Sequence, residues 1–141
     1  MIMLKSLINE RAGEPSELDA SINISVIRKG DPIYRKMGHH FSTHGNAFLD
    51  FDERTIFIDG DNADKENWTN DHFLFVQAHE IAHIKLNHHK GQDIDETYTD
   101  YCAIVHLYKK GYKDAAAIGI SQFEYRNGVT FEEYADNING K

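Results

Sequence analysis

Residues 79–83 read His-Glu-Ile-Ala-His, a pattern whose residue types and spacing could hold and use a metal ion. If the segment is helical, His79 and His83 lie on one face, so both imidazoles can reach one zinc ion at roughly 2.0–2.1 Å. Glu80 would then lie beside the ion, where a water molecule could bind. A carboxylate there can take a proton from attacking water and pass it to a leaving amine. The pattern therefore predicts zinc-dependent hydrolysis with Glu80 as the general base.

A hydrolytic zinc site needs a third protein ligand, and the sequence offers two candidates. Glu96 lies thirteen residues after His83, and Asp100 follows four residues later on the same face of a second helix. Glu96 would bind the ion while Asp100 accepts a hydrogen bond from a ligand imidazole. His89 is the alternative, at the third-histidine position of the pattern His-Glu-x-x-His-x-x-Gly-x-x-His, although Leu86 occupies the position of its glycine. We expect Glu96 to be the ligand.

Two segments together resemble a known class of zinc peptidase. Residues 79–83 followed by residues 96–100, which read Glu-Thr-Tyr-Thr-Asp, resemble the gluzincin arrangement. More narrowly, residues 73–103 resemble the ImmA/IrrE-type minimal metallopeptidases in their aromatic lead-in, their Leu-x-His end to the zinc helix and their Glu-led second helix. The resemblance implies a minimal zincin-like fold, one zinc ion held by the two histidines and Glu96, and proteolysis of a protein substrate. In that family the substrate is often a transcriptional repressor.

Simpler interpretations of the same residues stay open. His79 and His83 could be two surface histidines of an amphipathic helix, and Glu96 could merely close a capping box with Asp93. Two other functions follow: a catalytically silent zincin-like module that binds or regulates a partner, or a metal-free α+β interaction domain. Metal analysis of the purified protein separates the last from the others.

The first half of the chain predicts strands. Residues 21–27 alternate polar and apolar side chains, which is typical of a half-buried strand. Residues 47–51 and 55–58 are two β-prone runs with a short connection, and they predict a hairpin. The run 55–58 would be either a free edge for an extended substrate or part of an ordinary core hairpin. We also expect a short helix before Gly13 and a loop over residues 60–64.

The second half predicts helices, the first of them capped by Thr69 or Asp71 and carrying residues 79–83. Helices are expected over residues 70–88 and 93–110, from residue 114 onward, and after a capping box formed by Thr130 and Glu133. Strands first and helices after indicate an α+β chain. We expect a small twisted antiparallel-rich sheet followed by a helical half that carries the zinc helix.

Length and composition limit the remaining possibilities. A chain of 141 residues predicts a single domain over residues 1–141. A net charge of −8 with no stripe of basic residues works against direct binding of nucleic acid. No apolar run approaches the roughly 18 residues that cross a bilayer, and the N-terminal residues do not resemble a secretory signal, so we expect a cytoplasmic protein without membrane contact. Cys102 is the only cysteine, so nitrogen and oxygen must hold the zinc.

Overall fold

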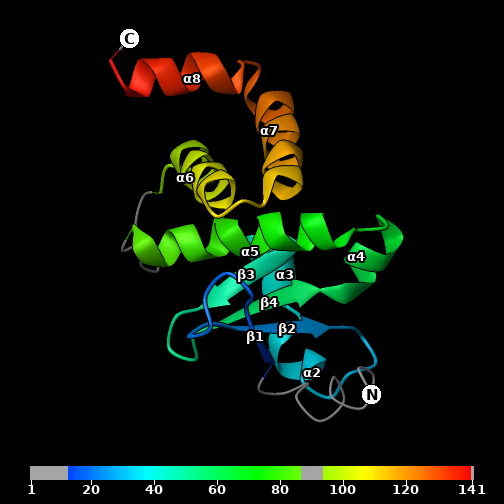
Figure 1. Cartoon of the computed structure of the whole chain (residues 1–141). Coiled ribbons are helices and arrows are strands. Elements are labelled where there is room, and N and C mark those ends of the chain that lie inside the picture. Colours follow the sequence, from blue (N-terminus) through cyan, green and yellow to red (C-terminus); the bar gives the residue numbers. More distant parts are fainter. Residues whose placement is uncertain (1–12, 87–93, 141) are drawn as a thin grey trace. The chain divides into compact units, whose positions relative to one another are not determined.

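The structure, a computed structural model, describes residues 13–86 and 94–140, and it divides the chain into two compact units, Met1–Trp68 and Thr69–Lys141 (Figure 1). The described part of the first unit holds a four-stranded sheet with short helices, and that of the second holds helices. The predicted α+β class is therefore confirmed. The single domain expected over residues 1–141 stays a prediction, and the helix expected before Gly13 lies almost entirely outside the described residues.

The sheet is mixed, with strand order β1-β2-β4-β3. Its strands are β1 (Glu14–Pro15), β2 (Asn23–Ile27), β3 (Ala47–Asp50) and β4 (Thr55–Asp59). The predicted β3–β4 hairpin is confirmed, whereas β2 pairs with β4 in parallel. Because β4 lies between β2 and β3, the idea that residues 55–58 form a free edge is wrong. The first four residues of β4 are all buried, and because successive side chains point to opposite faces, both faces of the strand are covered.

Short helices complete the first unit: α2 (Tyr34–Met37), α3 (His40–His44) and α4 (Gly60–Lys65). A cluster of buried apolar side chains joins β2, α3, β3 and β4, namely Ile27, Phe41, Phe48 and Phe57. The loop expected over residues 60–64 is wrong, because this segment is α4. The Asp59 side chain accepts a hydrogen bond from the Asn62 amide at 3.2 Å, which is the cap that starts the helix.

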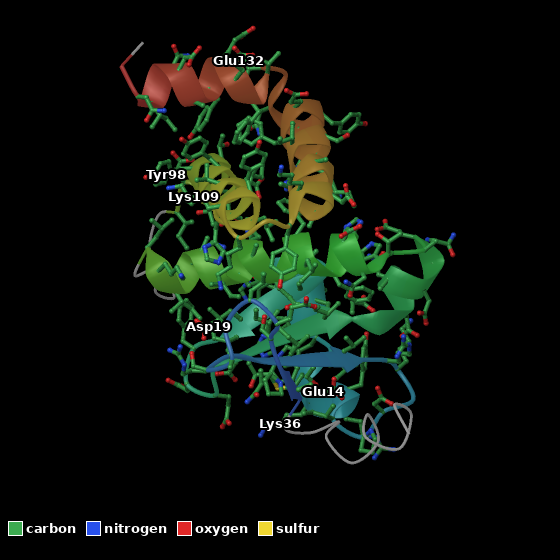
Figure 2. All side chains as sticks on the ribbon, in the orientation of Figure 1. Glu14, Asp19, Lys36, Tyr98, Lys109 and Glu132 are labelled. Atoms are coloured by element: carbon green, nitrogen blue, oxygen red, sulfur yellow. The ribbon has the colours of Figure 1, made fainter. Side chains whose placement is uncertain are left out.

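The second unit consists of α5 (Asn70–Lys85), α6 (Glu96–Lys109), α7 (Lys113–Asn127) and α8 (Phe131–Ile138). Helices α5, α6 and α7 pack against one another. At Gly119 of α7 the neighbouring helices lie close, since an added Cβ atom would be 2.7 Å from a ring carbon of Phe75 and 2.8 Å from a side-chain carbon of Ile104. Figure 2 shows the side chains on this frame, with Tyr98 and Lys109 near the two ends of α6.

Local capping explains where these helices begin. The Thr69 side chain accepts a hydrogen bond from the His72 amide at 3.4 Å, as one of the two predicted caps of α5. Asp95 caps α6 by accepting from the Tyr98 amide at 3.0 Å. Glu96 is the first residue of the helix. Asp93, the other member of the capping box considered for Glu96, lies outside the described residues. None of the described helices is long and apolar enough to cross a membrane.

Candidate metal centre

Helix α5 brings two imidazole rings together at the surface of the second unit. His79 and His83 lie four residues apart, so both project from one face of the helix. Their Nε2 atoms lie 3.2 Å apart, and the two ring planes meet at 80°. Both nitrogens therefore point toward the same small volume.

Helix α6 brings a carboxylate to the same place. Glu96 Oε2 lies 3.0 Å from His79 Nε2, and Glu96 Oε1 lies 3.3 Å from His83 Nε2. A tetrahedral zinc ion with bonds of 2.0–2.1 Å holds its ligand atoms about 3.3 Å apart. The three observed separations join the two Nε2 atoms to each other and each of them to a different oxygen of Glu96. All three lie close to that value, so these groups could hold a metal ion of that size. The Glu96 side chain is 59% exposed, which leaves water a way to the site.

The protonation of His79 shows why the cluster needs a cation. Its Nδ1 atom lies 2.6 Å from Asp100 Oδ1, and because an ionised carboxylate only accepts hydrogen bonds, Nδ1 must carry a proton and donate it. If the ring is neutral, Nε2 then presents a lone pair to the Glu96 carboxylate at 3.0 Å, which is repulsive. A proton on Nε2 can relieve this one contact, whereas a metal ion can satisfy both imidazoles and the carboxylate together.

The pKa of His79 reflects the same demand for positive charge. Burial by itself lowers this pKa, but hydrogen bonds with Asp100 and Glu96 and the negative charge of Glu80 outweigh it and raise the pKa to about 10. The surroundings of Nε2 therefore hold a cation strongly at neutral pH. Zinc in this position would replace the proton.

Glu80 is a second carboxylate beside the histidines, and its surroundings differ from those of Glu96. It is buried, and its Oε2 atom has no hydrogen-bond partner among the residues that the structure describes. Burial raises the pKa of Glu80 to about 7. Potential ligand atoms of His79, Glu80 and His83 all lie within 4.8 Å of one another, so Glu80 could in principle be a ligand.

Glu96 and Glu80 differ in two respects that bear on the predicted roles of ligand and base. Glu96 contacts both Nε2 atoms at 3.0–3.3 Å, which is the separation of ligands around one ion. Glu80 has a buried, unpartnered oxygen and a pKa close to neutrality, which suit a group that takes and returns a proton. The alternative ligand His89 lies outside the described residues.

The structure adds a residue that sequence reasoning missed. Arg126 of α7 donates a hydrogen bond from Nη2 to Asp100 Oδ2 at 2.6 Å. Twenty-six residues separate the two in the chain, and they belong to different helices, so no helical spacing connects them. Basic side chains in the last turn of a helix are common, and nothing in the local sequence marks this one.

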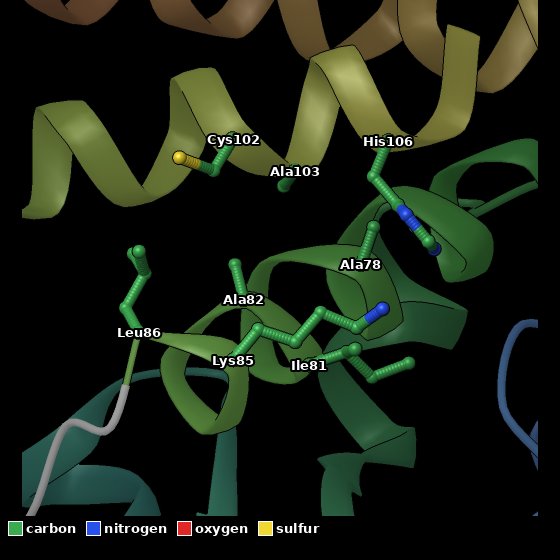
Figure 3. A pocket seen from close by; sticks show the side chains of 8 residues that line it. All are labelled: Ala78, Ile81, Ala82, Lys85, Leu86, Cys102, Ala103 and His106. Carbon is green, nitrogen blue, oxygen red and sulfur yellow. The ribbon is translucent and has the colours of Figure 1, made fainter. Parts of the chain in front are cut away.

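A pocket of about 160 Å³ also lies between α5 and α6. Figure 3 shows its walls, which are almost entirely apolar, with the Cys102 sulfur and the His106 ring on the α6 side. The lining residues are Ala78, Ile81, Ala82, Lys85, Leu86, Cys102, Ala103 and His106. None of the candidate metal ligands is among them, so the pocket is distinct from the metal centre.

Comparisons with protein-family models, with curated proteins and with solved structures found no significant match. The proposed chemistry of the site therefore rests on its own geometry and residue types.

Proposed function

We propose that this protein is a zinc-dependent metallopeptidase that hydrolyses a peptide bond of a protein substrate. One observation carries the proposal: two imidazole nitrogens and a carboxylate, from two helices, converge with mutual separations of 3.0–3.3 Å. A buried carboxylate with a pKa of about 7 lies beside them. The spacing of these residues, which resembles that of gluzincins, supports a peptide bond as the target.

Each residue has a defined task in this reaction. His79, His83 and Glu96 would hold the ion, and Asp100 accepts a hydrogen bond from His79 Nδ1, which leaves Nε2 free to bind it. Bound zinc would supply Lewis acidity for the scissile carbonyl and for water near neutral pH. Glu80 takes a proton from the attacking water and then delivers it to the departing amine. Burial raises the pKa of Glu80 into the range where it can do both.

The proposed substrate and compartment rest on the family resemblance and on the net charge. The resemblance to ImmA/IrrE-type peptidases favours a transcriptional repressor as the substrate, and the net charge of −8 disfavours direct contact with nucleic acid. We place the activity in the cytoplasm, where a repressor would be met.

Two substitutions separate metal binding from catalysis. Elemental analysis should find one zinc per chain in the wild type and in Glu80→Gln, and little in His83→Ala, which lacks a ligand. Cleavage of a mixture of unstructured peptides, followed by mass spectrometry, should fall roughly 10²–10⁴-fold in Glu80→Gln because the base is gone.

Glu132→Gln, an exposed change of the same kind on α8, is the matched control and should leave both zinc content and cleavage intact. A wild-type protein without zinc would refute the proposal. Zinc without cleavage of the peptides or of a candidate repressor would instead favour the catalytically silent module.

A further inference from the structure

Two hydrogen bonds join α7, through Asp100, to the candidate metal ligand His79. Arg126, in the last turn of α7, donates to one oxygen of Asp100, and the other oxygen accepts from His79 Nδ1, each at 2.6 Å. Helices α7, α6 and α5 thus contribute one side chain each. The Asp100 side chain is 5% exposed and that of Arg126 is 52% exposed, so the line starts at the surface and ends at a candidate ligand.

A neighbouring contact fixes the same two helices. Thr97 Oγ1 donates a hydrogen bond to Asn127 Oδ1 at 3.0 Å. The side-chain Nδ2 of Asn127 donates to the Phe123 backbone carbonyl at 2.8 Å. Consecutive residues at the end of α7, Arg126 and Asn127, therefore contact the first two turns of α6, which begins with Glu96. The end of α7 is itself defined by Gly128, whose φ of 68° stops the helix.

Asp100 needs a partner on each of its two oxygens. A buried carboxylate loses hydration and must recover it through hydrogen bonds, and a charged donor gives a stronger bond than a neutral one. With Arg126 in place, the carboxylate is held from two sides and cannot rotate freely. Without it, His79 would be the one described residue that orients the group, and the group would no longer fix the orientation of the His79 ring.

We propose that Arg126 is a positioning residue of the metal centre, which holds the Asp100 carboxylate so that His79 Nε2 faces the ion. It acts through Asp100, which lies between its guanidinium group and the proposed ligand His79. The inference rests on the proposed zinc function for its consequence, but the hydrogen-bonded line itself belongs to the protein with or without the ion.

The test compares Arg126→Met and Arg126→Lys with the wild type, and Arg28→Met is the matched control. Arg28 forms a similar arginine–aspartate pair with Asp64, at 2.9 Å in the first unit. Zinc affinity is measured by competition with a chromophoric chelator at fixed pH. Far-UV circular dichroism and thermal melting report on folding. The proton on His79 Nδ1, assigned by its loss in His79→Gln, is followed by NMR with the metal removed.

Arg126→Met should weaken zinc binding about 10- to 100-fold, the usual effect of removing a partner behind a metal ligand. The His79 Nδ1 proton should exchange faster with water, while circular dichroism is unchanged. Arg126→Lys keeps a charged donor and should recover most of the affinity, and Arg28→Met should change neither quantity.

Unchanged zinc affinity in Arg126→Met, or an equal loss in Arg28→Met, would overturn the proposal. If the wild type binds no zinc, the metal function fails, and the NMR measurement still decides whether Arg126 holds the line. Should Arg126→Met unfold, Arg126→Lys and Arg126→Gln supply the comparison, and the proposal then requires Arg126→Gln to bind zinc more weakly than Arg126→Lys.

Discussion

The two compact units bury different kinds of polar side chain. Among the described residues of the first unit, the buried polar side chains are all hydroxyls, those of Ser16, Ser25 and Thr55. The second unit buries one hydroxyl and three ionisable groups, namely Thr99, Glu80, His83 and Asp100. The three ionisable groups all belong to the candidate metal centre. Burial of charge is therefore concentrated where the proposed chemistry takes place.

This difference indicates which interactions dominate the interior of each unit. Hydroxyls are cheap to bury because one hydrogen bond satisfies them, whereas charged groups lose much more hydration. The first unit can rely on apolar packing, as in the cluster around Phe48 and Phe57. The second unit buries ionisable groups, whose lost hydration a bound cation would offset in the proposed metal centre. The contrast predicts that metal and pH act mainly on the second unit.

Zinc should give the largest effect. An ion that binds only the folded protein stabilises it by about 4 kcal/mol at a thousandfold excess over its dissociation constant. The melting temperature should rise on addition of zinc and fall again with a chelator. Hydrogen exchange should show the greatest gain in protection in α5 and α6, which carry the ligands. An equal gain in protection for the amides of β2 and β4 would contradict the predicted difference between the units.

Two matched core truncations should separate the units next. Ile58 of β4 and Leu107 of α6 are both fully buried, and replacing either by alanine should cost about 2–5 kcal/mol of unfolding free energy. Ile58→Ala should leave zinc affinity unchanged once the protein is folded, because β4 carries no ligand. Leu107→Ala should weaken it, because α6 positions Glu96. Denaturant titration and chelator competition measure the two quantities, and equal effects on zinc affinity would contradict the contrast.

A smaller effect is expected from pH on the metal-free protein. The pKa of Glu80 is raised from 4.5 to about 7, so the unfolded chain ionises first and stability falls as pH rises across that range. The pKa of His79 is raised from 6.5 to about 10, so its stabilising proton is present below 6.5 and is lost toward pH 10. Both groups therefore make the metal-free protein less stable from pH 5 to pH 9.

Thermal melting at pH 5, 7 and 9 measures this trend, and Glu80→Gln should remove its lower part. Zinc replaces the proton of His79, so binding should tighten as pH rises and flatten or reverse the slope. A metal-free protein that gains stability toward pH 9 would show that the folded state does not hold the protons of Glu80 and His79 more tightly than the unfolded chain does.

Local patterns account for what the sequence could predict. The four-residue spacing of His79 and His83 places both on one face of any helix, and the apolar positions of α5 make that helix favourable. The β3–β4 hairpin was predictable for the same reason, since two β-prone runs joined by a short turn pair locally. Glu96 and Asp100 could be placed relative to each other by helical spacing, and their meeting with His79 followed only if α6 lay beside α5.

Contacts between distant segments account for what could not be predicted. The parallel pairing of β2 with β4 depends on where a long connection returns, which no local pattern encodes. Residues 60–64 contain turn-forming types, yet the Asp59 cap turns them into α4. Arg126 meets Asp100 across 26 residues, through packing of whole helices, so its role became visible only in three dimensions.

The absence of a side chain at Gly119 affects the candidate metal centre, although Gly119 is not one of its polar residues. An alanine there would press a methyl carbon against Phe75 and Ile104, and α7 would have to back away from its two neighbours. Arg126 lies seven residues further on, two helical turns and about 10 Å along the axis. A substitution at Gly119, which has no polar group of its own, could therefore weaken the proposed zinc binding while every proposed ligand is kept.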